Sequence, residues 1–320
     1  MENLSLSEHA PSNSTLPILN MCGKNSFSFV FLPGSYSMLF VLSVTGNICV
    51  LLHYVTSEKK PSKFFAVNLA TLDLLMALTL PLMVDYHSRG RDWRFGEALC
   101  TVYLAMFYGD LYGASLFMLC VSVDRLLAVC YPLSYSRWMQ RWPCRPLACV
   151  CVWLIITGFV LWSSASLQVL NRQPDGTETC GSGFSEEQWR SQLPTLLALG
   201  SVVTFFLPYS VILTCYALTA WRLTKPRGVR QRWKSRSLRA IVTVIAIMTA
   251  SFLPFHIMQM ASVAHRLSRE PGERYSYRIC TGQQYVVLLA SLNSALDPFV
   301  YYFLSSKPKL SQLCSGRCQK

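Results

Sequence analysis

Three acidic residues lie alone in long apolar stretches of the chain. Asp73, Asp110 and Asp297 are each the only charged residue within a run of at least 20 residues. An ionised carboxylate at the centre of a bilayer costs about 2.5 to 3.5 kcal/mol on insertion scales, so each acid needs a partner or a function. Polar groups that converge at this depth could bind a small cation, relay a proton or pack through water.

The last of these acids belongs to a polar cluster within one predicted helix. Asn293 precedes Asp297 by four residues, so the two side chains share a helix face. Pro298 follows directly and loosens the helix, because it has no N–H to donate. Tyr301 lies about one turn further along. The cluster therefore adds an amide to the predicted mid-membrane polar core.

A charge pair ends the third apolar stretch. Asp124 and Arg125 stand where this stretch would leave the membrane for the cytoplasm. Side chains at the inner end of a span face the interior of the cell and lie far from any outer cavity. Their position indicates a cytoplasmic switch rather than a pore or a catalytic pocket.

Seven apolar stretches must position these residues. The chain is 52% hydrophobic and only 14% charged, whereas soluble domains carry about 25% charged residues. Each stretch exceeds the roughly 20 residues that a helix needs to cross a bilayer. Lipid offers the backbone no hydrogen bonds, so helices are the expected spanning form. We predict an all-α membrane protein with a seven-transmembrane helix bundle at 27–304, between tails at 1–26 and 305–320.

The distribution of charge predicts the orientation of this bundle. Lysine and arginine cluster in three connections, at residues 59–63, 137–145 and 222–239, and the positive-inside rule places these in the cytoplasm. The N-terminus would then be outside, where Asn3 and Asn13 begin glycosylation sequons, and the C-terminus inside. The net charge of +13 follows this topology, so it indicates contact with anionic membrane lipid and no nucleic-acid partner.

The chain has thirteen cysteines, and the predicted topology places some on the outer side of the membrane and others within the spans or at their inner ends. Cys22, Cys100, Cys180 and Cys280 fall on the oxidising outer side, where disulfides persist. Four cysteines allow three pairings, and sequence alone leaves the choice open. The cysteines within the spans are expected to pack as small apolar side chains.

The sequence offers little support for an enzyme or a transporter. Its histidines lie on different spans at different depths, and neither a metal-ligand spacing nor a nucleophile–base pair is visible. A transporter is expected to show internal repeats with broken helices at the midplane, and no repeat is found. We predict that the chain is not an enzyme, and we keep a transporter or non-signalling membrane scaffold as an alternative of a different class.

One short motif appears in each span, in a fixed order. The motifs are Gly46-Asn47, Asn68-Leu69-Ala70-Thr71-Leu72-Asp73, Trp93-Arg94-Phe95-Gly96 leading to Cys100 and Asp124-Arg125-Leu126, Trp153, Pro208 with Tyr216, Phe252-Leu253-Pro254-Phe255-His256, and Asp297-Pro298-Phe299-Val300-Tyr301. Together they resemble the rhodopsin-like (class A) G-protein-coupled receptors over roughly residues 36–303. Within that superfamily the chain is similar to the purinergic, lysophospholipid and protease-activated branch, above all to its orphan-like, purinergic-named members.

The resemblance implies an activation switch at the inner ends of the spans. Arg125 would bridge to Asp124 in the inactive state. On activation it would release toward Tyr216 and a heterotrimeric G protein of the Rho-activating or inhibitory class. Tyr301 would rotate inward with the seventh span. Leu126 replaces the aromatic residue that usually follows the arginine. This difference would affect the strength of the bridge between Arg125 and Asp124 in the inactive state.

The resemblance also implies a packing toggle and two disulfides. Phe252, beside Pro254, would be the toggle in the sixth span, where the superfamily more often has tryptophan. Cys100 and Cys180 would link the third span to the second extracellular loop. A further pair, Cys22 with Cys280, would link the N-terminus to the seventh span. Both disulfides would shape the ligand entrance.

A sodium site is a further expectation from the resemblance, and it involves an unusual acid. The site would lie beside Asp73, in a polar core with Asn47, Asn293 and Asp297. Asp110 stands where relatives generally carry asparagine. It would either join an unusually acidic cation site or stay protonated and bond to a neighbouring helix, since like charges raise one another's pKa. No other cofactor is expected.

The predicted ligand is a small extracellular amphipathic anion such as a lysophospholipid. Its anionic head would pair with arginine at the rim, and its tail would lie among aromatic side chains. A nucleotide is the alternative, although nucleotide receptors of this branch carry a basic residue near the position of Gln259. The ligand-contacting residues implied by the resemblance are Tyr86, His87, Tyr103, Phe107, Tyr108, Tyr112, His256, Gln259, Arg266 and Gln283.

The cytoplasmic tail is expected to lie on the membrane. Residues 307–310 suggest a short amphipathic eighth helix after the seventh span. Cys314 and Cys318 are candidate palmitoylation sites, and two acyl chains anchor a segment far better than one. These features predict a multi-pass protein of the plasma membrane.

Overall fold

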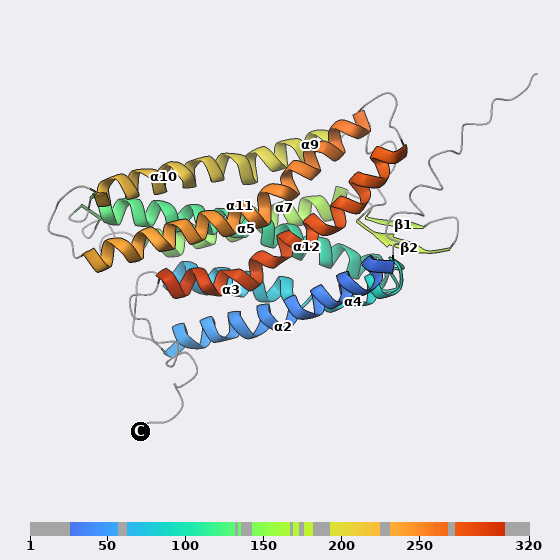
Figure 1. Ribbon diagram of the computed structural model, residues 1–320, viewed down its shortest axis with the longest axis horizontal. Coiled ribbons are helices and arrows are strands. Elements are labelled where there is room, and N and C mark those ends of the chain that lie inside the picture. Colours follow the sequence, from blue (N-terminus) through green and yellow to red (C-terminus); the bar gives the residue numbers. More distant parts are fainter. Residues whose placement is uncertain are drawn as a thin grey trace, which may run out of the picture.

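The fold is a bundle of long helices with a small hairpin at one end (Figure 1). The computed structural model describes residues 26–56, 63–131, 134–135, 143–166, 169–172, 176–181, 193–224, 231–267 and 273–304. Its elements are α2 (Ser26–Thr56), α3 (Lys63–Ala77), α4 (Leu80–Ser88), α5 (Gly96–Cys130), α7 (Cys144–Ser166), β1 (Leu170–Arg172), β2 (Glu178–Cys180), α9 (Leu193–Ser201), the π-helix η2 (Val202–Phe206), α10 (Leu207–Thr224), α11 (Gln231–Leu267) and α12 (Glu273–Leu304).

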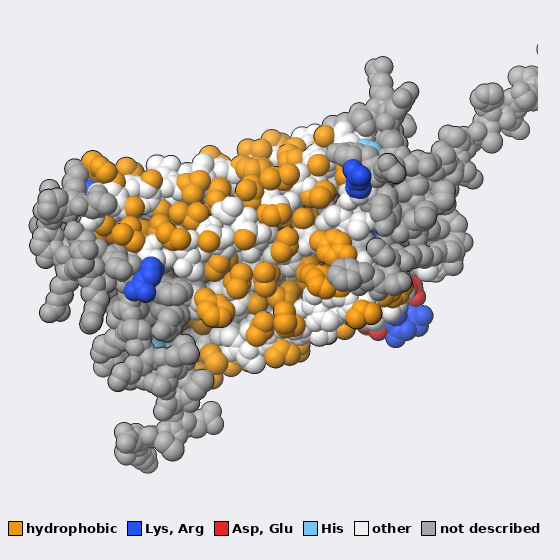
Figure 2. Space-filling model, in the orientation of Figure 1, with side chains coloured by type: hydrophobic (Ala, Val, Ile, Leu, Met, Phe, Trp, Pro, Cys, Tyr) orange, Lys and Arg blue, Asp and Glu red, His pale blue; other side chains and the backbone are white. Residues whose placement is uncertain are grey.

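Six ranges of the described residues are helical, long and apolar enough to cross a membrane. Two of them join consecutive helices: α3 with α4 (Phe64–Ser88), and α9 with η2 and α10 (Leu193–Leu223). The remaining long helix, α12, packs against α11, α2 and α3. Figure 2 shows hydrophobic side chains over the middle of the visible face, with the few coloured charged groups toward its two ends. This arrangement confirms a helical membrane bundle.

Prolines interrupt two of the spans, whereas other spans continue through the prolines they contain. Pro81 stands in the first turn of α4, just after the break that separates α3 from α4. Pro208 follows η2 directly, and a residue without an N–H four positions after Thr204 favours the wider π-turn there. Pro254 and Pro298 lie inside α11 and α12, which continue through them. The prolines therefore affect their helices in two different ways.

The motif Gly46-Asn47 fastens α2 to α12. The amide of Asn47 donates to the Ser294 carbonyl at 2.8 Å and to the Ser43 carbonyl at 3.0 Å. The Ser43 hydroxyl donates to that of Ser294 at 3.1 Å. A Cβ on Gly46 would lie 2.8 Å from Cγ of Pro298. The glycine is therefore required by the close approach of a rigid proline ring.

Gly46→Ala is expected to lower the free energy of unfolding by about 1 to 3 kcal/mol, the range for substitutions that overpack a core. The added methyl group meets the Pro298 ring, which cannot swing aside as a flexible side chain can. Gly34→Ala is the matched control, because a Cβ at Gly34 on the same helix has no atom within 4 Å. The measurement is a thermal-shift assay of both variants in nanodiscs, and equal melting temperatures would contradict the packing argument.

A buried tryptophan organises the hairpin end of the bundle. Trp93 is 1% exposed. Its backbone N–H donates to the Glu178 carbonyl at 2.7 Å, and its indole N–H donates to the Gly96 carbonyl at 2.9 Å. β1 and β2 pair antiparallel, with Leu170 opposite Cys180. The tryptophan thus joins the start of α5 to the hairpin.

The predicted disulfide between Cys100 and Cys180 is present. It links the first turn of α5 to β2, with 5.7 Å between the two Cα atoms. Cys100 is fully buried. The crosslink therefore holds the hairpin over this end of the bundle, next to Trp93.

Candidate functional site

The three predicted membrane acids come together from α3, α5 and α12. Asp73 and Asp297 are fully buried, and Asp110 is 3% exposed. The carboxyl groups of Asp73, Asp110 and Asp297 lie close enough to act on one another electrostatically. The amide of Asn293 donates to Oδ2 of Asp297 at 2.9 Å, as the four-residue spacing predicted. The fold thus concentrates carboxyl groups in the interior of the bundle.

Several oxygen atoms of this polar core have no hydrogen-bond donor among the described residues. They are both carboxyl oxygens of Asp73 and the Oδ1 atoms of Asn47, Asp110, Asn293 and Asp297. Buried polar atoms without a partner carry a large desolvation cost. A cation, water molecules or a shared proton would remove that cost.

The arrangement of side chains in the polar core determines what kind of cation it could hold. Among the described residues, no group of three or more His, Cys, Asp or Glu side chains is placed to hold a metal ion. A sodium ion would therefore need amide or hydroxyl oxygens beside the carboxylates. Asn47 and Asn293 each offer such an oxygen, so the residues present fit a hard monovalent cation.

The switch region at the opposite end of the bundle contains an ion pair that the sequence analysis did not identify. Asp124 of α5 accepts from Nε of Arg145 on α7 at 2.9 Å and from the Tyr135 hydroxyl at 2.7 Å. The Arg145 guanidinium also contacts the Tyr135 hydroxyl and lies over its ring. Only 12% of the Arg145 side chain and 14% of the Asp124 side chain are exposed.

Tyr135 acts as a donor in this network. Burial, together with the hydrogen bond to Asp124, raises the pKa of Tyr135 to about 12. Its hydroxyl therefore stays protonated at neutral pH and donates to the carboxylate. From the sequence, Arg145 was only one of several basic residues that indicate the topology. Its pairing with Asp124 could not be predicted, because it requires α7 to lie beside α5.

The other predicted switch residues lie in the same region. Tyr216 of α10 is 3% exposed, and its hydroxyl has no partner among the described residues. The Arg125 guanidinium is close enough to act electrostatically on Tyr216 and Tyr135. Tyr301 lies on α12, but its side chain is outside the described residues.

Aromatic rings fill the centre of the bundle toward the hairpin end. Ring centroids are 6.3 Å apart for Trp93 and Tyr103, 6.2 Å for Tyr103 and Phe107, and 5.5 Å for Phe107 and Phe255. All four side chains are buried. The predicted ligand-contacting aromatics of α5 therefore pack largely against one another and against α11.

α11 is joined to the fifth span by its predicted toggle and ligand residues. The His256 ring stacks on Phe205 of η2 with a centroid distance of 4.3 Å, and its Nδ1 lies 3.2 Å from the Ser201 hydroxyl. Phe252 is fully buried and meets Phe205 edge-on at 6.4 Å. One turn above His256, the Gln259 amide donates to the Leu197 carbonyl at 3.3 Å. The toggle thus contacts the π-helix directly.

Cavities lie to one side of the aromatic centre, between α5, α7 and the fifth span. The larger has a volume of about 780 Å³, and a smaller one of about 60 Å³ shares Tyr112, Phe159 and Leu196 with it. Of the predicted ligand residues, Tyr108 and Tyr112 line these spaces. Phe159 and Leu196 were not predicted to line a cavity, because the sequence does not distinguish apolar residues of a span that face a cavity from those that face lipid.

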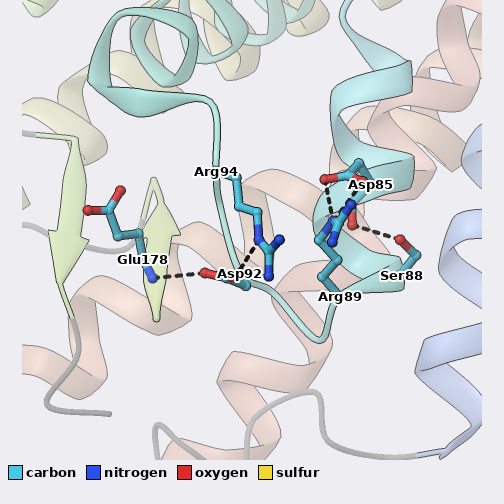
Figure 3. A network of polar contacts seen from close by, with 6 residues as sticks. All are labelled: Asp85, Ser88, Arg89, Asp92, Arg94 and Glu178. Carbon is cyan, nitrogen blue, oxygen red and sulfur yellow. Dashed lines mark hydrogen bonds and ion pairs between the residues drawn. The ribbon is translucent and has the colours of Figure 1, made fainter. Parts of the chain in front are cut away.

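Three of the rim arginines are already paired with acids. Nε of Arg89 lies 2.8 Å from Asp85, that of Arg94 lies 3.0 Å from Asp92, and that of Arg172 lies 2.6 Å from Glu178. Figure 3 shows the first two pairs and the bond from the Glu178 backbone N–H to Asp92. Each pair is local: one lies within α4 and the adjoining residue, one between residues two apart, and one within the hairpin.

A scan against protein families matches residues 46–301 to the 7 transmembrane receptor (rhodopsin family) model. The chain belongs to this receptor family. The receptor is 33% identical to purinoceptor 6 of Rattus norvegicus over 91% of this chain and 90% of the relative. It is 29% identical to G-protein coupled receptor 183 of Bos taurus, over 86% and 78%. It is 30% identical to the human uracil nucleotide/cysteinyl leukotriene receptor, over 97% and 83%.

These relatives confirm a class A G-protein-coupled receptor of the purinergic-like branch, located as a multi-pass protein in the plasma membrane. A receptor of this family binds an extracellular ligand and couples to a G protein. The relatives are receptors and not enzymes, in agreement with the sequence prediction. The predicted features that lie outside the described residues or side chains are Asn3, Asn13, Cys22, Arg266, Cys280, the eighth helix, Cys314 and Cys318.

Proposed function

We propose that the receptor binds an amphipathic anion of the lysophospholipid class at its hairpin end, which faces the cell exterior. On binding, it activates a heterotrimeric G protein through the switch at Asp124 and Arg125. The observation that supports this ligand class is the cavity between α5, α7 and the fifth span, because the described residues that line it are uncharged. Tyr112, Phe159 and Leu196 suit an aliphatic chain and offer little to a polar nucleoside or a sugar.

A nucleotide ligand is the second candidate, and the names of two relatives favour it. The residue one turn above His256 counts against it. Gln259 is 4% exposed, and its amide is bonded to the Leu197 carbonyl. An uncharged, buried side chain at this position does not neutralise a phosphate.

The anionic head of the ligand requires a cation at the rim. Arg89, Arg94 and Arg172 are tied to acids, so releasing any of them would cost an ion pair. We therefore assign the head group to other arginines of the hairpin end, such as Arg266 and the exposed Arg278. Each charge-assisted contact would be about twice as strong as a neutral hydrogen bond.

A panel of G-protein-activation sensors, including Rho-activating and inhibitory classes, tests the proposal in cells that express the receptor. Cells are challenged with 1-oleoyl-lysophosphatidic acid and then with uridine and adenosine nucleotides, and untransfected cells are the control. A receptor-dependent response to the lysolipid supports the proposed ligand class. A response to nucleotides alone, or to neither ligand at normal surface expression, would overturn it.

We also propose that Asp110 takes part with Asp73 in binding a sodium ion, together with the amide oxygens of Asn47 and Asn293. Asp110→Asn is then expected to reduce the dependence of agonist potency on sodium concentration several-fold, since one of the coordinating carboxylates is lost. Glu97→Gln is the control, because Glu97 lies on the same helix but at its exposed first turn. The measurement is agonist-stimulated signalling across a sodium series. Unchanged sodium dependence in Asp110→Asn would instead support a neutral, protonated Asp110.

A further inference from the structure

Tyr135 lies in the connection between α5 and α7, at the end of the bundle opposite the hairpin. Residues 134–135 form a helical turn there, and the backbone N–H of Tyr135 donates to the Tyr131 carbonyl at 2.8 Å. The Tyr135 side chain is half-buried. Connections between helices run over the surface, where other enzymes can reach them. The Tyr135 hydroxyl is therefore a candidate for chemical modification.

Two arginines and one acid surround this hydroxyl. It donates to Oδ1 of Asp124 at 2.7 Å. Nη2 of Arg145 contacts the same phenolic oxygen, and the guanidinium carbon lies 5.5 Å from the centre of the Tyr135 ring. The charge of Arg125 is close enough to act on the hydroxyl electrostatically. These two cations and one anion leave an excess of positive charge around a single phenolic oxygen.

An excess of positive charge at this oxygen suits a phosphate group. A phosphotyrosine carries a charge of about −1.5 to −2 at neutral pH and offers three acceptor oxygens. The planar fork of a guanidinium matches a phosphate through two parallel hydrogen bonds. Arg145 already contacts the oxygen that would carry the phosphate. Its side chain would therefore need to move little to bind the new group.

Asp124 would be displaced from its present partners by the phosphate. Phosphorylation removes the O–H donor of Tyr135 and places a second anion beside the carboxylate. Nε of Arg145 lies 2.9 Å from Oδ1 of Asp124, so this guanidinium is within reach of both anions. The phosphate carries the larger charge, and the expected rearrangement moves Arg145 from the carboxylate toward the phosphate.

Tyr131 offers a comparison within the same connection. It is 57% exposed, so it is more accessible than Tyr135. Among the described residues, its hydroxyl has no arginine partner. A phosphate on Tyr131 would be solvated by water, whereas a phosphate on Tyr135 would meet two guanidinium groups. Exposure alone favours modification of Tyr131, and the surrounding charges favour Tyr135.

We propose that Tyr135 is a phosphorylation site for a cytoplasmic tyrosine kinase, and that Arg145 and Arg125 bind the added phosphate. The kinase transfers the γ-phosphoryl group of a nucleoside triphosphate. A bond forms between the phosphorus and the phenolic oxygen, and the bond from the phosphorus to the bridging oxygen breaks. The nucleoside diphosphate leaves, and the hydroxyl proton passes to a base of the kinase. Once bound to the phosphate, Arg125 is withheld from a docking G protein.

The first test maps phosphate on the receptor in cells. Cells that express the full-length receptor are treated with pervanadate, which inhibits tyrosine phosphatases, and the isolated receptor is digested with trypsin. Cleavage after Arg125 and Arg137 releases residues 126–137. This peptide contains both tyrosines of the connection, and fragmentation spectra distinguish them. Phosphate on Tyr135 is expected. Recovery of the peptide without phosphate, or with phosphate on Tyr131 alone, would contradict the proposal.

The second test measures whether the arginines hold the phosphate. A soluble tyrosine phosphatase is added to the isolated phosphorylated receptor in nanodiscs, and loss of phosphate from Tyr135 is followed by mass spectrometry. The loss is expected to be several-fold faster in Arg145→Gln and in Arg125→Ala, because an unbound phosphate is open to the phosphatase. Arg222→Gln is the control, since it removes a positive charge from the last turn of α10, where the guanidinium lies over the Trp221 ring. Equal rates in all four proteins would show that the arginines do not bind the phosphate.

Salt provides the same information without a substitution. Dissolved ions screen the attraction between the phosphate and the guanidinium groups, so added potassium chloride should speed the loss of phosphate from the wild-type receptor. A synthetic phosphopeptide of residues 126–137 reports the effect of salt on the phosphatase itself. A salt effect on the receptor no larger than that on the peptide would count against the arginine contacts.

The orientation of the bundle is tested separately, because the proposal rests on the proposed orientation, in which the hairpin end faces outward. An epitope tag at the C-terminus is expected to bind its antibody only after the cells are permeabilised. A tag detected on intact cells would reject this orientation, and with it both the proposed activation switch and the phosphorylation site. An internal tag together with an unmodified Tyr135 would reject the phosphorylation site alone.

Discussion

Arg125→Ala is expected to reduce ligand-stimulated G-protein activation to the level of cells that lack the receptor, while ligand binding is retained. The guanidinium stands at the end of α5 opposite the hairpin, near the hydroxyl groups of Tyr216 and Tyr135. Its five donors make it the side chain best suited to carbonyl and hydroxyl acceptors on a docking protein. Alanine removes this group but leaves the cavities and the hairpin end, at the opposite end of the bundle, unchanged.

The measurement compares sensor activation with binding of a radiolabelled ligand on the same cells. Arg125→Lys is the matched variant, since lysine keeps the charge but loses the planar fork. We expect lysine to recover only part of the response. Full activation by Arg125→Ala at equal surface expression would show that the switch lies elsewhere.

Asp124→Asn and Arg145→Gln are expected to change ligand-independent signalling in opposite directions. Without a carboxylate at position 124, no anion at this position restrains Arg125, so basal signalling rises. Without the guanidinium at position 145, the largely buried Asp124 loses this ion pair and is free to attract Arg125. Arg125 is then held more strongly, and signalling falls.

Both variants are also expected to lose stability. Breaking a buried ion pair costs about 3 to 5 kcal/mol, and residual contact with water lowers that figure to about 2 to 3 kcal/mol here. Tyr135→Phe removes a neutral donor to a charged acceptor and should cost about 1.5 kcal/mol, the low end of the range for such a hydrogen bond. The measurements are basal sensor activity and thermal unfolding in nanodiscs. Basal signalling that moves in the same direction in Asp124→Asn and Arg145→Gln would rule out a competition between the two arginines for Asp124.

A double-mutant cycle isolates the pair from its surroundings. If Asp124 and Arg145 interact directly, the destabilisation of the double variant is smaller than the sum of the two single effects. Additive effects would indicate that each side chain acts through other neighbours.

The amino-acid sequence by itself determined the class of the fold and the family. The length of an apolar segment and the position of basic residues beside it depend on that segment alone. They determine whether the segment spans the bilayer and in which direction, without reference to its neighbours in space. The same holds for short motifs on one helix face, such as Asn293 with Asp297, since helix geometry alone brings them together. The disulfide between Cys100 and Cys180 was expected from the resemblance and is present.

Only the tertiary structure decided which helices meet and where space remains between them. The electrostatic interaction of Asp73 with Asp110 and the ion pair of Asp124 with Arg145 each involve separate helices. Their partners depend on crossing angles and rotations that no single span specifies. The cavity between α5, α7 and α9 is likewise a property of packing, because helices in lipid associate through shape and small residues rather than through hydrophobicity.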